Sequence, residues 1–429
     1  IGIGKDEFFL ASDASPIVEY TNRVVYLEDG EIAVLKKGEK LHVVTQNNAK
    51  VNPKINTIKL NIGQLEKGGY PHFMLKEIFE QPDCIKDCMR GRVSIDGSDI
   101  ALSAIIDNKK RLLSARRFVI VACGTSWHAA LIGKYLIEQF CRFPVEVEYA
   151  SEFRYRNPVI NENDVVIAIS QSGETADTIT AVKRAEERGA HILVLTNRED
   201  SSIVRHAGSL LPLKAGIEVS VAATKSYTAQ LTCLYLLGLA LASARGSLPP
   251  AELGKLRDEL RQLPAKMEKA LSEDGKVKAA AERLKDYRQM IYIARGVNLP
   301  TAQEGALKLK EISYVNANGY PAGELKHGPI ALLDENMPVT AVLAPGGRVY
   351  DKMISNCEEA RARHAFLTGV SFDGDRRAEE LFDLLLTVPS TAEIFSPLLL
   401  NLPLQLLAYH IADLLGREVD QPRNLAKSV

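Results

Sequence analysis

A cluster of small polar residues is the segment of this chain best suited to hold a phosphate group. The segment 170–175, Ser-Gln-Ser-Gly-Glu-Thr, follows an apolar run and precedes a helical pattern. Side-chain donors, free backbone N–H groups and the helix dipole can together bind an anion at a helix N-terminus. The alternative is a simple helix N-cap, for which one Ser or Thr is enough. We therefore predict a phosphate site whose donors are Ser170, Gln171, Ser172 and Thr175.

A second polar segment follows the preceding apolar run. Cys123-Gly-Thr-Ser126 comes directly after residues 118–122. In an open parallel sheet, ligands bind at the edge where the strands end. Thr125 and Ser126 should therefore lie beside the phosphate site, although this segment by itself is a weak signal.

Three charged residues in the second half of the chain have helical spacing. Glu304, Lys308 and Glu311 follow the i, i+4, i+7 pattern, which places them on one face of a helix. Such a triplet is often no more than a solvated, salt-bridged surface. Here the helix follows the first apolar run of a repeated pattern, where the first copy carries Thr125. A carboxylate beside a lysine at that place could act as an acid or base.

Two further residues are candidates of a different kind. His327 lies in the segment 318–329, which is rich in glycine and proline and is expected to be a loop. Most single histidines are structural or merely exposed, but such loops often carry working groups. Lys427 lies in the C-terminal tail, where a lysine is normally solvated. Spacing alone does not identify it as a nucleophile.

The elements that must position these residues form a repeat. Four apolar runs recur at an offset of about 173 residues, and each precedes a segment with helical character. Alternating strands and helices predict a parallel α/β sheet covered on both faces. Each copy ends in a long apolar helix. The paired runs are 118–123 with 291–295, 164–170 with 338–344, 191–196 with 364–368, and 211–213 with 384–386.

The remaining segments surround these two copies. We expect the copies at 111–247 and 285–416, with a helical linker at 248–284, a helical connection at 67–110 and a tail at 417–429. Residues 1–66 differ in character. Their runs around Glu28-Asp-Gly30 have the pattern of a β-hairpin over 23–35. The segment is too short for a core of its own.

Composition excludes several classes of protein. The 429 residues are 46% apolar and 25% charged, as in ordinary globular proteins. Lys plus Arg (53) nearly balance Asp plus Glu (54), so we expect neither nucleic-acid nor membrane binding. Six scattered cysteines favour a reducing cytoplasm, and no ligand cluster predicts a metal. The apolar runs are shorter than the roughly 20 residues of a membrane span, and no signal peptide is visible.

Five motifs together resemble the bacterial type of the glutamine:fructose-6-phosphate amidotransferase family, the glucosamine-6-phosphate synthases. They are the segments 123–126, 170–175, 304–311, 323–329 and 420–429, in the order of the family. The resemblance covers essentially the whole chain. It implies an α/β fold of two tandem doubly wound parallel-sheet domains, the flavodoxin-like SIS (sugar isomerase) domains. Residues 1–66 would be a short β remnant of the glutaminase domain and its linker, and the tail 417–429 would close the active site.

The same resemblance implies a reaction and roles for five residues. The isomerase part would convert fructose 6-phosphate, with ammonia from glutamine, to glucosamine 6-phosphate, and it would also bind glucose 6-phosphate. Lys427 would form a Schiff base with the C2 ketone, and Glu311 would move a proton between C1 and C2. His327 would assist ring opening, while Lys308 and Glu304 would support the proton transfers. A homodimer is implied because the neighbouring subunit supplies the His327 loop in this family. No cofactor or metal is implied.

The resemblance assigns the remaining positions to binding. The phosphate would lie on the donors of segment 170–175, and the sugar would lie near the backbone of the loop at 221–223. Arg423 would order the tail, and Ala426 would lie near the ammonia path. Ala223 stands where relatives often carry Ser, so its contact would be through the backbone. The substrate-binding set is Thr125, Ser126, Ser170, Gln171, Ser172, Thr175, Val221, Ala223, Arg423 and Ala426.

One departure and two alternatives complete the expectations. No cysteine precedes Cys84, whereas the glutaminase of the family uses an N-terminal cysteine, so this chain as given is expected not to hydrolyse glutamine. A non-catalytic sugar-phosphate-binding SIS regulator would need the segment 170–175 but neither Glu311 nor Lys427. A simple phosphoglucose-type isomerase would need no Schiff-base lysine.

Overall fold

The structure is a computed structural model that describes residues 1–429 except 12–16, 18–19, 29, 58–65, 95–98 and 428–429. Contacts between residues divide it into two compact units, Ile1–Pro71 and His72–Lys427. We describe each unit by itself.

The first unit consists of two small antiparallel sheets. Four strands pair in the order β2-β1-β3-β7 and three in the order β4-β5-β6. Val24, Val25 and Val43 are buried in this unit. The strands are β1 (Gly2–Ile3), β2 (Phe8–Phe9), β3 (Arg23–Val24), β4 (Glu31–Val34), β5 (His42–Thr45), β6 (Lys50–Val51) and β7 (Asn56–Thr57).

The hairpin predicted over 23–35 is wrong. Strand β3 pairs with β1 and β7, whereas β4 pairs with β5 in the other sheet. The two apolar runs have different surroundings, because Val24 is buried while Ile32 is 51% exposed. They therefore cannot share one half-buried hairpin face. The predicted turn includes Asp29, which lies outside the described residues.

The second unit contains two five-stranded sheets with the same topology. In the first sheet the order is β12-β11-β10-β8-β9, and in the second it is β14-β13-β15-β16-β17. All pairings in both sheets are parallel. Numbered within each copy, this is the flavodoxin-like order 2-1-3-4-5. The prediction of two tandem doubly wound domains is confirmed.

The strands of the first sheet are β8 (Arg117–Ala122), β9 (Val145–Tyr149), β10 (Asp164–Ser170), β11 (His191–Thr196) and β12 (Ser209–Pro212). Those of the second are β13 (Gln289–Ala294), β14 (Asn316–Pro321), β15 (Val339–Val342), β16 (Leu367–Phe372) and β17 (Leu384–Val388). Central strands such as β10 are buried along their whole length, because helices cover both faces.

Two of these strands are absent from the sequence prediction. The repeat analysis found no counterpart of β9 and β14, which are the second strand of each copy. Part of the segment expected to be a loop, 318–329, is instead the end of β14 followed by the 3₁₀ helix η5 (Ala322–His327). Strand β14 joins the sheet despite its polar sequence. It pairs with β13 along a full parallel ladder, which ends at Ala294 and Pro321.

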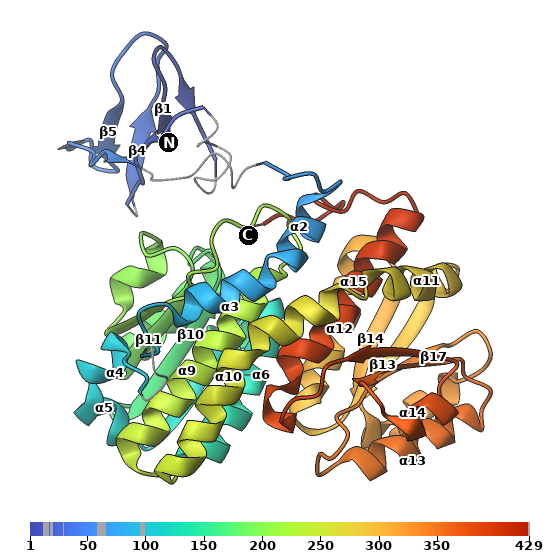
Figure 1. Ribbon diagram of the computed structural model, residues 1–429. Helices are drawn as coiled ribbons and strands as arrows, with labels where there is room; N and C mark the ends of the chain where they lie inside the picture. Colours follow the sequence, from blue (N-terminus) through green and yellow to red (C-terminus); the bar gives the residue numbers. More distant parts are fainter. Residues whose placement is uncertain (12–16, 18–19, 29, 58–65, 95–98, 428–429) are drawn as a thin grey trace. The chain divides into compact units, whose positions relative to one another are not determined.

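Helices cover the sheets and connect the copies (Figure 1). Helix α12 (Leu299–Ser313) lies between the two copies and contacts both α6 (Gly124–Leu136) and α15 (Ser396–Leu414). The predicted linker forms α10 (Pro250–Leu271) and α11 (Asp274–Leu284). The other α-helices are α2 (Phe73–Phe79), α3 (Gln81–Met89), α4 (Ser103–Ile106), α5 (Lys109–Leu113), α7 (Ala150–Phe153), α8 (Ala176–Glu186), α9 (Lys225–Arg245), α13 (Tyr350–Arg361) and α14 (Arg376–Leu381).

The short helical segments complete the second unit. They are the π-helix η2 (Ile137–Cys141) and the 3₁₀ helices η3 (Ser202–His206), η4 (Gly296–Asn298), η6 (Pro329–Leu332) and η7 (Glu393–Phe395), besides η5.

Two helical segments, Lys225–Arg245 and Glu393–Leu414, have the length and apolar character of a membrane span. Both are longer than the apolar runs that the sequence suggested. The most apolar windows of the two segments are 89% and 94% buried inside the protein, as in the core helices of soluble proteins.

Candidate functional site

The segment 170–175 forms a tight loop between β10 and α8. Ser170 Oγ lies 3.1 Å from Thr175 Oγ1 and accepts a hydrogen bond from the Gly173 N–H. Ser172 Oγ accepts from the Glu174 N–H at 3.2 Å. Within this described loop and helix, no side chain caps the first turn of α8. The N–H groups of that turn are therefore available to an anion, as expected for a phosphate site.

Gly173 is required by the way this loop is braced. Its φ is +68°, and an added Cβ would lie 2.0 Å from Ser201 Oγ. The loop is also tied to its neighbours, because Ile203 N–H donates to the Gly173 carbonyl and Ser202 N–H donates to Glu174 Oε1. Glu174 thus supports the loop, while the hydroxyl residues remain at the sheet edge.

The charged triplet on α12 is buried, so the alternative of a solvated surface is wrong. Glu304 and Lys308 have fully buried side chains, and the side chain of Glu311 is 21% exposed. Lys308 Nζ lies 2.5 Å from Glu311 Oε2 and 3.4 Å from Glu304 Oε1. Three charges on one helix face can be buried in this way because each has an opposite charge beside it.

Thr125 joins this triplet to the first copy. Its hydroxyl donates to Glu304 Oε1 at 3.0 Å and accepts from Lys308 Nζ at 3.1 Å. Because β8 and β10 are neighbouring parallel strands, Thr125 and the loop 170–175 follow strand ends at the same edge of the sheet. The structure thus brings the predicted acid/base residues to the predicted sugar-binding segment.

Electrostatic interactions within the triplet favour the charged forms of Glu304 and Lys308. Burial alone would raise the pKa of Glu304, but the Lys308 ammonium and hydrogen bonds from His128 and Thr125 lower it below its ordinary value. Burial alone would lower the pKa of Lys308, but the carboxylates of Glu304 and Glu311 raise it. A fixed ammonium beside a carboxylate at an apolar site can stabilise charge that develops on a substrate.

Two neighbours of these residues escaped the sequence analysis. His128 Nδ1 lies 2.7 Å from Glu304 Oε2, and Gln230 Nε2 on α9 donates to Ser126 Oγ at 2.9 Å. His128 stands only two positions after the segment 123–126, on the first turns of α6, so its proximity to that motif was an available signal. No local signal marks Gln230, which lies in an apolar helix.

The tail lysine is held inside the second unit. Lys427 Nζ donates to Glu218 Oε2 at 2.7 Å and to the Ser220 carbonyl at 2.6 Å. Glu218 is buried, and its other bonds come from the Thr224 and Ser226 N–H groups and the Ser226 hydroxyl. Burial alone would raise the pKa of Glu218, but Lys427 and these donors lower it to about 2. A solvated lysine is therefore excluded.

A second buried carboxylate supports the loop that receives Lys427. Glu77 on α2 accepts hydrogen bonds from the Val219 and Ser220 N–H groups through Oε1. Its Oε2 is buried and has no hydrogen-bond partner among the described residues. Burial and the nearby charge of Glu218 raise the pKa of Glu77 to about 8.

The other predicted tail and loop residues lie around this lysine. Val221 N–H donates to the Asp420 carbonyl, and the carboxylate of Asp420 caps α2 through the Phe73 and Met74 N–H groups. The guanidinium of Arg423 lies 4.3 Å from the centre of the Tyr314 ring, so this tail residue contacts the residue that follows α12. Ala223 is half-buried and Ala426 is exposed.

His327 is not brought to this site within one chain. It is exposed at the end of η5, and the structure gives it no hydrogen bond or ion pair with any described residue. In the described part of the chain, no group of three or more His, Cys, Asp or Glu residues could hold a metal ion.

Comparison with known proteins gives this geometry a family context. The SIS domain family matches residues 111–240 and 283–413, which correspond to the two sheets and their helices. A protein of Bacteroides thetaiotaomicron named glutamine–fructose-6-phosphate aminotransferase [isomerizing] is 55% identical over all of this chain and 70% of its own length. A protein of the same name from Chlorobaculum tepidum is 50% identical, over all of this chain and 69% of its own length.

Solved structures agree with this comparison. The C-terminal domain of glucosamine-fructose-6-phosphate aminotransferase from Francisella tularensis matches with a TM-score of 0.79 and 38% identity, over 83% of this chain and 100% of that domain. Glucosamine-6-phosphate deaminase from Thermotoga maritima matches with a TM-score of 0.66 and 20% identity, over 83% of this chain and 99% of its own. At that identity the second match concerns the fold alone.

Proposed function

This chain belongs to the family of isomerising glutamine–fructose-6-phosphate aminotransferases, and on that premise we propose how its residues divide the work of one reaction. The chain carries the isomerase part of a glucosamine-6-phosphate synthase. Its substrate is fructose 6-phosphate. Its product is glucosamine 6-phosphate when ammonia is supplied and glucose 6-phosphate when it is not.

The phosphate of the substrate binds at the N-terminus of α8. Ser170, Gln171, Ser172 and Thr175 surround it, and the uncapped N–H groups of the first helical turn donate to its oxygens. The sugar then extends toward Thr125, Ser126 and the backbone at Val221 and Ala223. This orientation places its reacting carbons near α12.

Lys427 attacks the substrate at C2. Its Nζ, as the free amine, adds to the carbonyl carbon, and loss of water leaves an imine. Glu218 and the Ser220 carbonyl hold Nζ before the attack. Ammonia can displace the lysine from C2, which frees Lys427 and leaves nitrogen on the sugar. Ala426, directly before Lys427, lies near the ammonia path, and Arg423 orders the tail over the site.

Glu311 carries the proton transfer that follows. Once ammonia has replaced the lysine, the carboxylate of Glu311 removes a proton from C1 and returns it to C2, while the nitrogen gains a proton and the C1 hydroxyl loses one, so that C1 becomes the aldehyde and C2 keeps the nitrogen. Without ammonia, water hydrolyses the lysine imine to the open-chain ketone, and the same transfer from C1 to C2, with O2 protonated and O1 deprotonated, gives glucose 6-phosphate. Glu311 suits this role because it is the partly exposed member of the triplet, at 21%, while Glu304 and Lys308 are fully buried. Lys308, which is itself paired with Glu304, fixes the position of Glu311, and both residues support the proton transfers.

His327 assists ring opening from the neighbouring subunit of a homodimer. Its exposure and its lack of contacts with the described residues of its own chain support this role. All six cysteines are free thiols, which supports a cytoplasmic location. The first unit is proposed to correspond to the end of the glutaminase region and its linker.

The position of Lys427 carries this proposal, because its Nζ lies 2.7 Å from Glu218 Oε2 and its side chain, 18% exposed, is held beside the loop that is proposed to contact the sugar. Borohydride reduction in the presence of fructose 6-phosphate should attach the sugar to Lys427, as read by peptide mass spectrometry. Lys427→Arg should abolish the adduct. Labelling of another lysine, or no labelling, would contradict the Schiff-base assignment.

A non-catalytic sugar-phosphate-binding regulator remains the alternative that requires the same phosphate loop. The two are separated by NMR of fructose 6-phosphate in deuterated water without a nitrogen source. An isomerase produces glucose 6-phosphate with deuterium at C2, whereas a regulator binds without exchange. The buried triplet at Thr125 favours the isomerase, because a binding module has no need of a base.

A further inference from the structure

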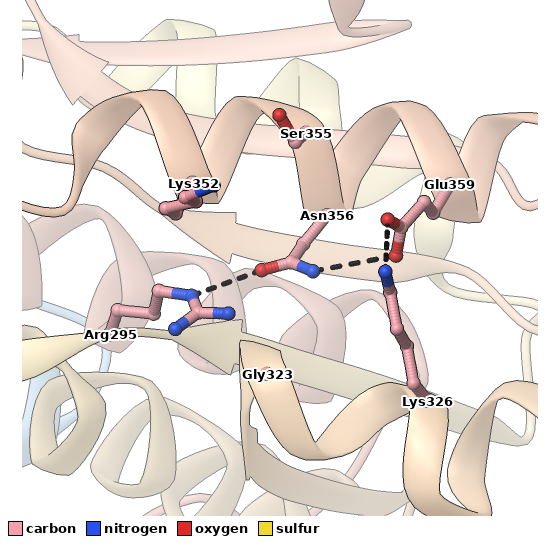
Figure 2. Close-up of a pocket in the computed structure, with 7 residues that line it drawn as sticks. All are labelled: Arg295, Gly323, Lys326, Lys352, Ser355, Asn356 and Glu359. Carbon is pink, nitrogen blue, oxygen red and sulfur yellow. Dashed lines mark hydrogen bonds and ion pairs between the residues drawn. The ribbon is translucent and has the colours of Figure 1, made fainter.

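The second sheet has a cavity at the edge that corresponds to the phosphate-binding edge of the first. The cavity has a volume of about 360 Å³ and lies between Arg295, the 3₁₀ helix η5 and helix α13 (Figure 2). Arg295 directly follows β13, as Cys123 directly follows β8, and α13 follows β15. The strands β13 and β15 flank the point where strand order reverses, which is the usual place for a ligand in such sheets.

The charged residues that line this cavity are mostly cationic. Three cations, Arg295, Lys326 and Lys352, face one carboxylate, Glu359. Lys326 Nζ lies 2.6 Å from Glu359 Oε1, so that carboxylate is already paired. The side chains of Arg295 and Lys352 therefore give the cavity an excess of positive charge. An anion is the complementary ligand.

Arg295 is held in place but has donors to spare. Its Nε donates to Asn356 Oδ1 at 3.0 Å, and the Asn356 amide donates to Glu359 Oε2 at 3.4 Å. Asn356 is only 4% exposed, so this arrangement is fixed by a buried side chain. Among the described residues, no partner bonds to Nη1 or Nη2 of Arg295 or to Nζ of Lys352. A fixed guanidinium with two free nitrogens suits the bidentate recognition of a phosphate.

Gly323 makes room for this guanidinium. A Cβ at this position would lie 2.8 Å from Nη2 of Arg295 and 3.2 Å from its central carbon. Gly323 therefore forms a part of the cavity wall that has no side chain, and the guanidinium of Arg295 lies beside it. The loop after β15 differs from its counterpart in the first sheet, because Ala344-Pro-Gly-Gly347 offers no hydroxyl. An anion here must be held by cationic side chains instead.

We propose that this cavity is a second binding site, separate from the catalytic one, for a phosphorylated sugar of hexose size. Arg295 and Lys352 bind the phosphate, while Asn356 and Glu359 provide polar groups for sugar hydroxyls. The volume suits a small ligand, since binding pockets begin at roughly 300 Å³. The site depends on no residue of the proposed Schiff-base reaction.

The test counts bound ligand on the whole chain by equilibrium dialysis with radiolabelled glucitol 6-phosphate. This probe has no carbonyl and so cannot react with Lys427. The wild type should approach two molecules per chain. The Arg295→Gln, Lys352→Gln double variant should approach one, with the second affinity weakened about tenfold or more. Lys352→Gln alone changes an exposed side chain and should weaken the second site without affecting folding.

Two controls make the count decisive. Lys278→Gln changes an exposed lysine on α11 and should leave two molecules bound. Turnover of fructose 6-phosphate, measured on the same samples, reports on the catalytic site, so its failure is distinguished from failure of this proposal. One molecule per chain in the wild type, or two in the double variant, would overturn the second site. Inorganic phosphate that competes there as tightly as glucitol 6-phosphate would overturn its assignment to a sugar.

Discussion

Exposure distinguishes the roles of three charged residues that lie on one helix. Glu304 and Lys308 are fully buried, and each is bonded to Thr125, so they form part of the structural junction between the two domains. Glu311 is bonded to Lys308 but keeps 21% of its side chain exposed. Of the two acids, only Glu311 has side-chain surface that a substrate could contact, so we propose Glu311 as the base.

Replacing Glu311 with Gln should remove proton transfer and leave binding intact. Lys308 keeps Glu304 as a partner, so its buried charge stays compensated. The rate of deuterium incorporation from solvent should fall by about 10²- to 10⁴-fold, the usual contribution of a positioned base. Binding of glucitol 6-phosphate should change little. Glu282→Gln on the exposed face of α11 serves as the control, and equal loss of binding and exchange in Glu311→Gln would contradict the assignment.

Glu77 should make the stability of the protein fall as pH rises from about 4.5 to about 8. Its pKa rises from an ordinary 4.5 to about 8 in the folded chain, because of burial and then the charge of Glu218. Between these values the folded state keeps a proton that the unfolded state has lost, so the free energy of unfolding falls as pH rises. The loss is complete above about pH 8 and is on the order of a few kcal/mol.

Glu77→Gln cannot titrate and should remove this dependence. Chemical denaturation at several values between pH 6 and pH 9 compares the midpoints of the wild type and the variant. The wild-type midpoint should decline more steeply, and the difference between the two proteins should level off above pH 8. Glu218 titrates near pH 2, outside this range. Parallel declines in both proteins would show that another group is responsible.

Motif residues could be predicted from the sequence because their chemistry is local. A hydroxyl-rich segment after a strand predicts an anion-binding loop. Residues Ser170 to Thr175 do form a loop at that place. Glu218, Glu77 and Gln230 carry no such signal, since their partners are 100 or more positions away or lie across a loop. Their importance comes from burial and from tertiary contacts. A single sequence contains no information on either.

At the scale of elements, the loop 170–175 and helix α8 act as one binding unit. The loop has its shape because Gly173 adopts a positive φ where a Cβ would collide with Ser201. That shape leaves the first N–H groups of α8 free for a phosphate. Helix α8 supplies the dipole. The conformation of Gly173 determines whether the loop leaves the N-terminus of this helix accessible to a phosphate.

Gly173→Ala should therefore impair substrate binding more than stability. Displacement of Ser201 should raise the KM for fructose 6-phosphate at least about tenfold, because the donors no longer converge. Gly189→Ala is a matched control, since Gly189 follows α8, has a φ of +80° and leaves a Cβ 3.4 Å from Glu162. It should lower the melting temperature and leave KM unchanged. Equal effects of both variants on KM would contradict the role of the loop.

Element prediction succeeded where the chain is apolar and failed where it is not. The central strands β8, β10 and β13 are continuous Val- and Ile-rich runs, buried on both faces, and the sequence shows them directly. Strand β9 alternates Val with Glu, and β14 reads Asn-Ala-Asn-Gly-Tyr-Pro, so neither has that pattern. Both are edge strands that join a sheet because a neighbour provides the ladder. Strand β14 depends on tertiary pairing and not on local preference, whereas β9 has the alternating pattern of a half-exposed edge strand, which a search for continuous apolar runs misses.

At the scale of the whole molecule, two copies of one fold have become different parts of one site. The first copy carries the phosphate loop, and the second contributes the charged helix α12 to the same sheet edge. The second sheet has an edge at Arg295 that is equivalent to the edge of the first sheet with the loop 170–175. The proposed catalytic site does not use this second edge. His327 is exposed and has no hydrogen bond or ion pair with the described residues of its own chain, which is the arrangement expected if it acts in the site of a neighbouring subunit.

Complementation between two inactive variants tests whether the site spans two subunits. His327→Ala and Glu311→Gln chains should each be nearly inactive as homodimers. If His327 acts in the neighbouring site, a mixed dimer contains one intact site and one doubly altered site. Random mixing then restores roughly a quarter of wild-type turnover, because half of the dimers are mixed and one of their two sites works.

The control mixes Glu311→Gln with Lys427→Arg. Lys427 binds Glu218 of its own chain, and Glu311 lies on α12 of the same unit, so every site in this mixture lacks one of the two groups. No activity should return. If the His327→Ala mixture also stays inactive although mixed dimers form, His327 acts within its own chain or not at all. Recovery in the first mixture and not in the second requires a site that is completed by a second copy of this chain.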